Sequence, residues 1–196
     1  LWLLFPIVLY VVRPPRVYDG IRHFLFVLPA MAIVAAAGGA SLRIARRPAL
    51  VMILIVVSLV PAATAMMRIH PYQYAYYNEL AGGLGGASGR YETDYWMTSY
   101  REAMLWVNDH RCSGTTRVLV AANEYSAVTA AGYAAPGVEV TSTMRRSQEP
   151  QLPERFDYFI ATVRFRMAMN YPETPIAAAI GRDGATFTVV RGGCNR

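Results

Sequence analysis

Long apolar runs alternate with short arginine-rich segments over the first 67 residues. Two uncharged runs, residues 24–42 and 48–67, are each about 20 residues long, which is the length an α-helix needs to cross about 30 Å of hydrocarbon. Residues 1–12 form a third apolar run that starts without a Met or a charged segment. We therefore expect a piece of a longer protein, with a partial span at its start rather than a signal peptide. The alternative, buried helices of a soluble protein, is disfavoured by two uncharged runs of this length.

Beyond residue 98 the pattern shortens and predicts a small α/β domain over residues 99–196. Ser99 is expected to cap the first helix, with Glu102 as its capping-box partner. Apolar runs separated by turn residues, including Asp183-Gly184, predict the remaining elements. Helices are expected at 99–110, 124–133 and 174–180, and strands at 117–122, 138–143, 156–163 and 185–191. Alternating helices and strands of this kind form layered α/β structures.

Residues 68–98 connect the apolar region, residues 1–67, to this domain. Four tyrosines fall within residues 72–77, which predicts an interfacial helix with its rings at the headgroup layer. A saccharide or lipid-headgroup contact is the alternative. The glycine-rich stretch 82–90 is interpreted as a flexible linker, because it lacks the Gly-Lys-Ser/Thr ending and the preceding strand of a phosphate-binding loop.

Positive charge is concentrated beside the apolar runs. Residues 1–68 carry seven Arg and one Asp, whereas the acidic and basic residues of the remainder cancel. This distribution indicates membrane topology, and no nucleic-acid partner is expected. The segment 43–47 carries three Arg and no acid, which favours the cytoplasmic side, but the segment 13–22 also has three Arg, offset only by Asp19. Charge alone therefore decides the orientation weakly.

The two cysteines, Cys112 and Cys194, lie near the two ends of the predicted domain. Such a pair suits a disulfide in an oxidising compartment, closing a loop worth roughly 4 kcal/mol in the chain-entropy model. Two unrelated free thiols are the alternative. The disulfide interpretation and the charge pattern both place residues 68–196 on the outer side of the membrane.

Two groups of polar residues are candidate binding sites. Asp19, Arg22 and His23 lie beside an apolar run, where Arg can grip a lipid phosphate with two parallel hydrogen bonds; the alternative is that they are flanking anchors that reach the headgroups. Asp94, Tyr95 and Trp96 belong to an acidic and aromatic cluster, residues 90–96. This cluster is interpreted either as a saccharide surface or as a surface turn whose Trp96 seats the domain on the membrane.

No metal site or cofactor is expected from the sequence. The three histidines, His23, His70 and His110, lie far apart, and no Cys or His pair has ligand spacing. Both cysteines are interpreted as structural rather than nucleophilic, and the G-x-S-x-G motif is absent.

Several segments together resemble a known family. They are YDGIRHFLF (18–26), HPYQY (70–74), YNEL (77–80), ETDYW (92–96) and SYREA (99–103). As a set they resemble the C-terminal part of bacterial glycosyltransferase family 39 membrane proteins, relatives of the protein mannosyltransferases and of the aminoarabinose transferase, with the GT-C architecture. The resemblance covers essentially the whole chain.

The resemblance implies the end of a polytopic membrane α-helical bundle followed by an extracytoplasmic α/β domain, in the bacterial inner (cytoplasmic) membrane. Such enzymes move a sugar from a polyprenyl-phosphate donor to a glycan, lipid or protein acceptor on the outer face. Their catalytic carboxylate, a general base, lies in an early outer loop that this sequence does not contain, so the chain alone is expected to be inactive. Arg22 and His23 would contact the donor phosphate and stabilise the departing polyprenyl phosphate, with Asp19 orienting them. A membrane-anchored binding domain and a transporter or assembly subunit are the other hypotheses.

Overall fold

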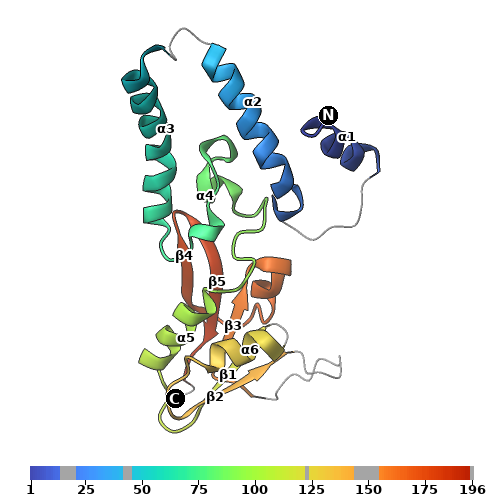
Figure 1. Ribbon diagram of the computed structural model, residues 1–196. Helices are drawn as coiled ribbons and strands as arrows, with labels where there is room; N and C mark the ends of the chain where they lie inside the picture. Colours follow the sequence, from blue (N-terminus) through green and yellow to red (C-terminus); the bar gives the residue numbers. More distant parts are fainter. Residues whose placement is uncertain (14–20, 42–45, 122–123, 144–154, 195–196) are drawn as a thin grey trace. The chain divides into compact units, whose positions relative to one another are not determined.

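The computed structural model describes residues 1–13, 21–41, 46–121, 124–143 and 155–194 (Figure 1). The side chains of Ile21, Arg22 and Glu124 lie outside this description. The chain divides into two compact units, Leu1–Val60 and Pro61–Arg196. Each unit is described by itself.

The first unit consists of apolar helices. It contains α1 (Leu4–Val12), the 3₁₀ helix η1 (Ile21–Val27), α2 (Leu28–Ser41) and most of α3 (Pro48–Arg68), which continues into the second unit. The segments His23–Ser41 and Pro48–Arg68 are long and apolar enough to cross a membrane, with mean hydropathies of 2.0 and 2.5. The two predicted apolar helices are therefore present, shifted by one residue at most.

The side chains of these helices are suited to an apolar surrounding. None of the most apolar stretch of α3 is buried within the structure, so its apolar residues form a large exposed surface that needs a covering of lipid or protein. The hydroxyls of Ser41 and Ser58 donate to the carbonyls of Gly38 and Ile55, at 2.6 and 2.7 Å. These two hydroxyls thus find partners in the backbone of their own helices, as a hydrocarbon environment requires.

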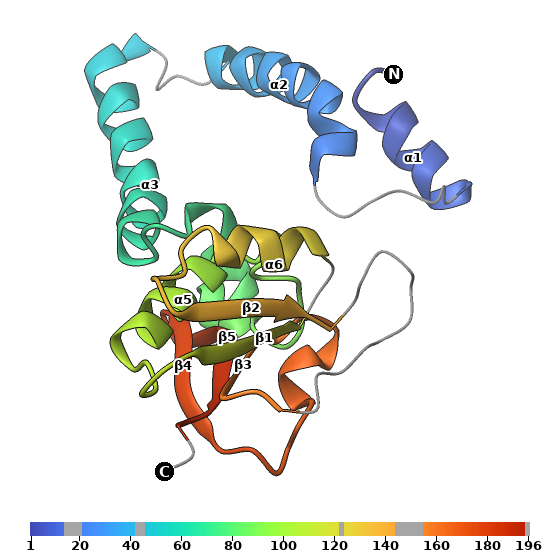
Figure 2. The same cartoon turned by 90° about the horizontal axis from the view of Figure 1, so that it is seen from below.

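The second unit is built on a five-stranded sheet of order β2-β1-β3-β5-β4. Its strands are β1 (Thr116–Ala121), β2 (Val138–Ser142), β3 (Tyr158–Thr162), β4 (Ile176–Arg182) and β5 (Ala185–Gly192). β1 pairs in parallel with β2 and β3, and β5 pairs antiparallel with β3 and β4. Figure 2 shows the five strands of this mixed sheet from below. The expected small α/β domain is therefore confirmed.

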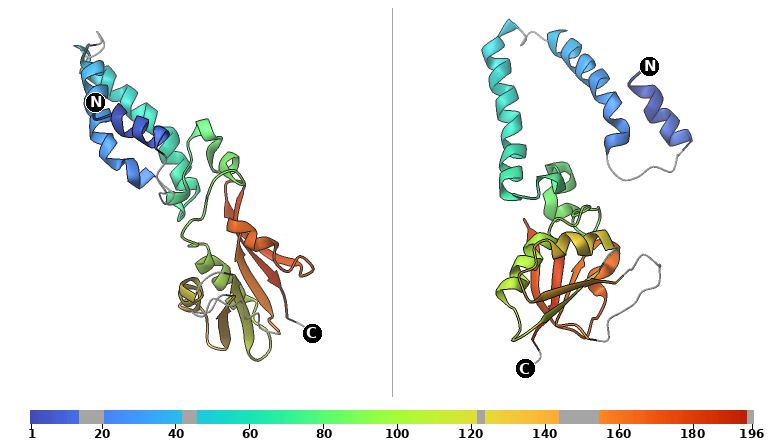
Figure 3. Two further views of the ribbon diagram at one scale, coloured as in Figure 1. Left: turned by 90° about the vertical axis from the view of Figure 1, so that its right-hand side faces the viewer. Right: turned by 60° about the horizontal axis from the view of Figure 1, so that its bottom comes forward.

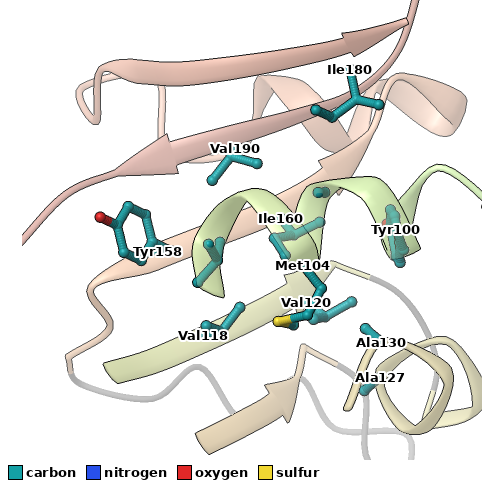
Figure 4. Packing of buried hydrophobic residues seen from close by; sticks show 12 residues of the cluster. Tyr100, Met104, Val118, Val120, Ala127, Ala130, Tyr158, Ile160, Ile180 and Val190 are labelled. Carbon is teal, nitrogen blue, oxygen red and sulfur yellow. The ribbon is translucent and has the colours of Figure 1, made fainter. Parts of the chain in front are cut away.

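Alternate residues of the central strands pack on opposite faces of the sheet. Val118, Val120 and Ile160 pack with α5 (Tyr100–Asp109) and α6 (Glu124–Ala131) on one face (Figure 4). Their neighbours Leu119 and Phe159 pack on the other face, beside the 3₁₀ helix η5 (Arg164–Met169). The left view of Figure 3 shows α5 and α6 on one side of the sheet and η5 on the other. Covering on both faces explains why β1 and β3 are almost continuously apolar.

The segment between α3 and α5 packs against the β4–β5 hairpin. Ile69, Tyr72 and Leu84 form a buried cluster with Ala185 and Phe187. The predicted interfacial helix is wrong, because the segment forms only two short 3₁₀ helices, η3 (Gln73–Ala75) and η4 (Glu79–Ala81). The prediction of a flexible linker at residues 82–90 is also wrong, because this stretch contains a short helix, α4 (Gly83–Ala87), with two buried side chains.

One predicted element of the α/β domain has the wrong type. The expected helix at 174–180 is the strand β4, which pairs with β5 across the Asp183-Gly184 turn. Both turn residues have positive φ, as a two-residue hairpin turn requires. Cross-strand pairing thus overrides the helix propensity of the three alanines in β4. The other predicted elements are present with shifted ends.

The two cysteines form a disulfide with a Cα–Cα distance of 5.2 Å. Cys112 lies between α5 and β1, and Cys194 follows β5. Next to this bridge, the Tyr158 hydroxyl donates to the His110 carbonyl at 2.6 Å. The disulfide therefore fastens the residues that follow β5 to the turn between α5 and β1.

Candidate functional site

Asp94 organises the loop that precedes α5. Its side chain is only 3% exposed, and its two carboxylate oxygens accept hydrogen bonds from the backbone N–H groups of Thr98 and Ser99, at 3.0 and 3.3 Å. The hydroxyls of Tyr74 and Ser99 also donate to it. Asp94 is therefore a buried anchor of the loop, and both of its oxygens accept hydrogen bonds from within the chain.

Ser99 serves the same network rather than capping α5. It has helical backbone angles, and its side chain makes no capping hydrogen bond to the helix. Since its hydroxyl donates to Asp94, the buried Thr188 hydroxyl of β5 donates to Ser99 across 2.7 Å. The predicted capping box is wrong because the two side chains have other partners: Ser99 binds Asp94, and Glu102 binds Arg182.

The Asp94 loop carries two aromatic residues, of which Trp96 is exposed and Tyr95 is half-buried. Tyr95 and Trp96 contact each other edge to face with ring centroids 5.1 Å apart. Trp96 is 68% exposed, and the next residue, Met97, has a left-handed backbone with φ of 54°. Both aromatic residues are held by a loop whose base is fixed by the buried carboxylate.

Arg164 lies two residues after Thr162, the last residue of β3, and joins this loop to the sheet. Its Nε lies 2.6 Å from Oε2 of Glu92, and its guanidinium lies over the Tyr95 ring at 4.1 Å from the centroid. The cation–π contact and the ion pair hold the guanidinium flat against the loop. Neither Arg164 nor its contact with Tyr95 was predicted from the sequence.

A cleft lies between the loop, α6 and Arg164; we call it the aromatic cleft. It has a volume of about 460 Å³ and is lined by Tyr95, Trp96, Met97, Tyr100, Tyr125, Ser126, Thr129 and Arg164. The volume falls in the range of small-ligand sites. A second, more polar hollow of about 540 Å³ lies between residues 88–94 and 162–166 and shares Arg164.

The aromatic cleft lies at the carboxyl ends of two neighbouring parallel strands. The buried Tyr100 hydroxyl donates to the Ala121 carbonyl at the end of β1, at 2.6 Å, and accepts from the Thr162 N–H at the end of β3, at 3.1 Å. From β1 the chain continues through α6 to β2, and from β3 it continues through η5 to the β4–β5 hairpin on the other side. Open α/β sheets bind ligands where the connections diverge in this way.

A separate polar cluster fixes the segment after α3 to the domain. Arg182 donates to both oxygens of Glu102, at 2.8 and 3.3 Å, and the Tyr72 hydroxyl donates to Glu102 at 2.7 Å. Burial alone would raise the pKa of Glu102, but hydrogen bonds from Arg182 and Tyr72, with the charges of Arg182 and Arg101, hold it below its ordinary value. Burial and the hydrogen bond to Glu102 raise the pKa of Tyr72, so that its hydroxyl remains a donor.

The candidate phosphate contacts are only partly described. Asp19 lies outside the described residues, and Arg22 is described only as part of the backbone of η1. His23 is half-buried, and its Nε2 has no hydrogen-bond partner among the described residues. These residues belong to the first unit, whereas Asp94, Tyr95 and Trp96 belong to the second. Within the described part of the chain, no group of His, Cys, Asp and Glu side chains is arranged to hold a metal ion.

Sequence reasoning missed Tyr125, Ser126 and Thr129, which α6 contributes to the cleft. A signal was available, because these residues follow the predicted strand 117–122 at its carboxyl end, where ligands bind in parallel sheets. For Arg164 a similar signal existed, since it follows the predicted strand 156–163. Comparison of the chain with protein-family models, curated proteins and solved structures finds no match.

Proposed function

We propose that this chain is the C-terminal part of an integral-membrane glycosyltransferase, which moves a sugar from a polyprenyl-phosphate donor to an acceptor on the outer face of the bacterial inner membrane. The resemblance to glycosyltransferase family 39 supplies the reaction. The catalytic base belongs to an early outer loop outside this sequence. No cofactor is part of the proposal.

The observation that carries the proposal is the mutual contact of the residues behind the resemblance. Tyr72 of HPYQY donates to Glu102 of SYREA, and Tyr74 of HPYQY donates to Asp94 of ETDYW. Ser99 of SYREA also donates to Asp94, and the Tyr77 hydroxyl donates to the Glu92 carbonyl at 2.7 Å. Four of the five motifs, all in the second unit, thus form one hydrogen-bonded assembly, as expected of a motif set with a common structural role.

The membrane location is supported by the two exposed apolar helices. Each has the length and hydropathy of a membrane span, and the chain leaves α3 at Arg68 for the segment that packs on the α/β domain. The disulfide of that domain suits an oxidising compartment. We therefore place residues 68–196 on the outer side, and the segment 43–47, part of which lies outside the described residues, in the cytoplasm.

In the proposed reaction, this chain binds and positions the substrates and does not supply the catalytic base. Arg22 and His23 would hold the donor phosphate, and the positive charge of Arg22 would favour departure of the polyprenyl phosphate. Asp19 would orient them. The α/β domain would receive the acceptor.

A transfer assay tests the proposal. Membranes containing the intact protein are supplied with radiolabelled polyprenyl-phosphate sugars, and label in glycan, lipid and protein is counted against membranes that lack the protein. We expect label to move to one acceptor class only when the protein is present. Equal labelling in both membranes with every donor would refute the proposal.

A second candidate function is favoured by the aromatic cleft. A membrane-anchored domain without catalytic activity, which binds glycan outside the cell membrane, would need the same exposed aromatic residues and the same two apolar helices. The intact sequence separates the two functions. A transferase needs several further spans and an acidic residue in an early outer loop, whereas a tethered binding domain needs neither.

A further inference from the structure

We infer that the aromatic cleft binds a neutral saccharide through its pyranose rings, with Trp96 and Tyr125 as the stacking residues. This inference rests on the proposed function, because it assigns the cleft to the glycan acceptor. It narrows the acceptor from three chemical classes to one.

The two stacking residues are exposed although the loop that carries one of them is held rigidly. Trp96 is 68% and Tyr125 is 78% exposed. Asp94 fixes the base of the loop, and the Ser126 hydroxyl donates to the Met97 sulfur at 3.4 Å, which joins the loop to α6. Trp96 is therefore solvent-exposed on a loop whose backbone is fixed by hydrogen bonds, as expected of a preorganised binding surface.

The chemistry of the cleft matches a sugar ring. The faces of aromatic rings are electron-rich, and the axial C–H groups of a pyranose present a weakly positive face to them. Beside the rings, the Thr129 hydroxyl donates to the Tyr125 carbonyl at 2.8 Å, which leaves its oxygen as an acceptor for a sugar hydroxyl. Apolar stacking with a few polar contacts is the usual composition of small-ligand sites.

The charge of the cleft indicates that the saccharide is neutral. The cationic side chain among its lining residues is Arg164, which is paired with Glu92 at 2.6 Å and lies against the Tyr95 ring. Among the lining residues that the structure describes there is no Asp or Glu. A phosphorylated or acidic ligand would therefore find no uncompensated positive charge here.

The sheet topology disfavours an extended peptide as the occupant. β1 and β3, at whose carboxyl ends the cleft lies, are interior strands that are paired on both sides. They offer no strand edge to which a peptide could add. A peptide would have to bind by side-chain contacts alone.

Saturation-transfer NMR of the intact protein tests the inference. The protein, in a detergent without a sugar headgroup, is titrated with mannohexaose, maltohexaose, xylohexaose and a tyrosine-free hexapeptide. We expect saturation transfer to the ring protons of at least one oligosaccharide. Trp96→Ala and Tyr125→Ala should each weaken that binding about tenfold or more, since buried aromatic contacts dominate binding surfaces. Trp2→Ala, an exposed tryptophan in the first unit, is the matched control and should leave binding unchanged.

Three results would overturn the inference: no transfer to any oligosaccharide, equal binding by the wild type and both cleft variants, or cleft-dependent binding of the hexapeptide instead. Because both side chains are exposed, near-UV circular dichroism should show that the variants fold like the wild type. Sugar transfer from the polyprenyl donor is measured in parallel. Oligosaccharide binding without sugar transfer would support the saccharide site and refute the transferase proposal. Sugar transfer without oligosaccharide binding would support the transferase proposal and refute the saccharide site.

Discussion

Arg182 donates to both carboxylate oxygens of Glu102, at 2.8 Å to Oε2 and 3.3 Å to Oε1. The pair connects β4 to α5, and Arg182 also donates to the His70 carbonyl at 3.3 Å. Through Tyr72 the same carboxylate holds the segment that follows α3. One ion pair thus joins three parts of the second unit.

This relationship predicts a pH dependence. Interaction with Arg182 and Tyr72 holds the pKa of Glu102 below its ordinary value of 4.5 despite burial, so the unfolded chain takes up the proton first as the pH falls. The stabilisation is therefore present at pH 7 and is lost as the pH falls through the lowered pKa. Thermal unfolding between pH 7 and pH 3 should show a smaller loss of stability on acidification for Glu102→Gln than for the wild type. Because the Glu102 side chain is 38% exposed, the difference will be modest.

The control for this measurement is Glu173→Gln, a change at an exposed glutamate. It should retain the acid sensitivity of the wild type. If Glu102→Gln lost stability on acidification as steeply as the wild type, the pair with Arg182 would not be the source of the dependence.

Asp94→Asn should destabilise the second unit although it conserves shape. Both oxygens of Asp94 accept from backbone N–H groups, so either orientation of the amide places an NH₂ group against an N–H donor. Loss of charged hydrogen bonds with a buried mismatch should cost about 2 to 3 kcal/mol, measured by chemical or thermal unfolding. Asp109→Asn, at an exposed aspartate of α5, should change stability by less than about 0.5 kcal/mol. Equal stability of the two variants would remove Asp94 as the anchor.

Replacing both cysteines should destabilise the α/β domain. The bridge spans a sequence separation of 82 residues, which the chain-entropy model values at roughly 4 kcal/mol. The Cys112→Ser, Cys194→Ser variant should unfold at a lower temperature than the wild type without reductant. The wild type itself should migrate differently on a gel after reduction, and its cysteines should resist thiol labelling until reduced. Labelling of both cysteines in the native, unreduced protein would contradict the bridge.

Arg22→Ala in the intact protein should weaken use of the lipid-linked sugar. If Arg22 grips the donor phosphate, its removal should raise the KM for the donor about tenfold, the loss expected for a charge-assisted hydrogen bond. Folding should be unchanged. Arg46→Ala, proposed to lie at the cytoplasmic end of the spans, is the matched control and should leave donor kinetics unaltered. If Arg22→Ala left the donor kinetics unaltered, Arg22 would be a flanking anchor at the membrane surface and not a contact of the donor phosphate.

Much of the fold could be predicted because its signals are local. The apolar runs and the strands β1 and β3 follow from continuous hydrophobicity. The helix α5 follows from the spacing of Ala103, Trp106 and Val107, of which Ala103 and Val107 are fully buried. The strand β4 could not be predicted from its composition, because its three alanines favour a helix. It is a strand because it pairs with β5. The Asp183-Gly184 turn predicts the strand that follows it, and the same turn also indicates a hairpin with a strand before it.

The site was less predictable because it depends on contacts between distant segments. The sequence of the cluster 90–96 suits either a saccharide surface or a surface turn. In the structure Asp94 is buried and accepts a hydrogen bond from the distant Tyr74 hydroxyl, a contact that no local pattern reveals. Tyr125 and Arg164 reach the cleft only because β1 and β3 pair in parallel. Periodicity within a single sequence does not specify which strands pair.

The most direct test of the central claim is sugar transfer by the purified intact protein in proteoliposomes. Labelled sugar on polyprenyl phosphate is supplied with an acceptor extract, and mass spectrometry follows the release of free polyprenyl phosphate and the mass added to the acceptor. We predict equimolar release and addition, dependent on the protein. Donor that stays intact with every sugar and acceptor, in vesicles where the protein is folded and its disulfide is formed, would contradict the account.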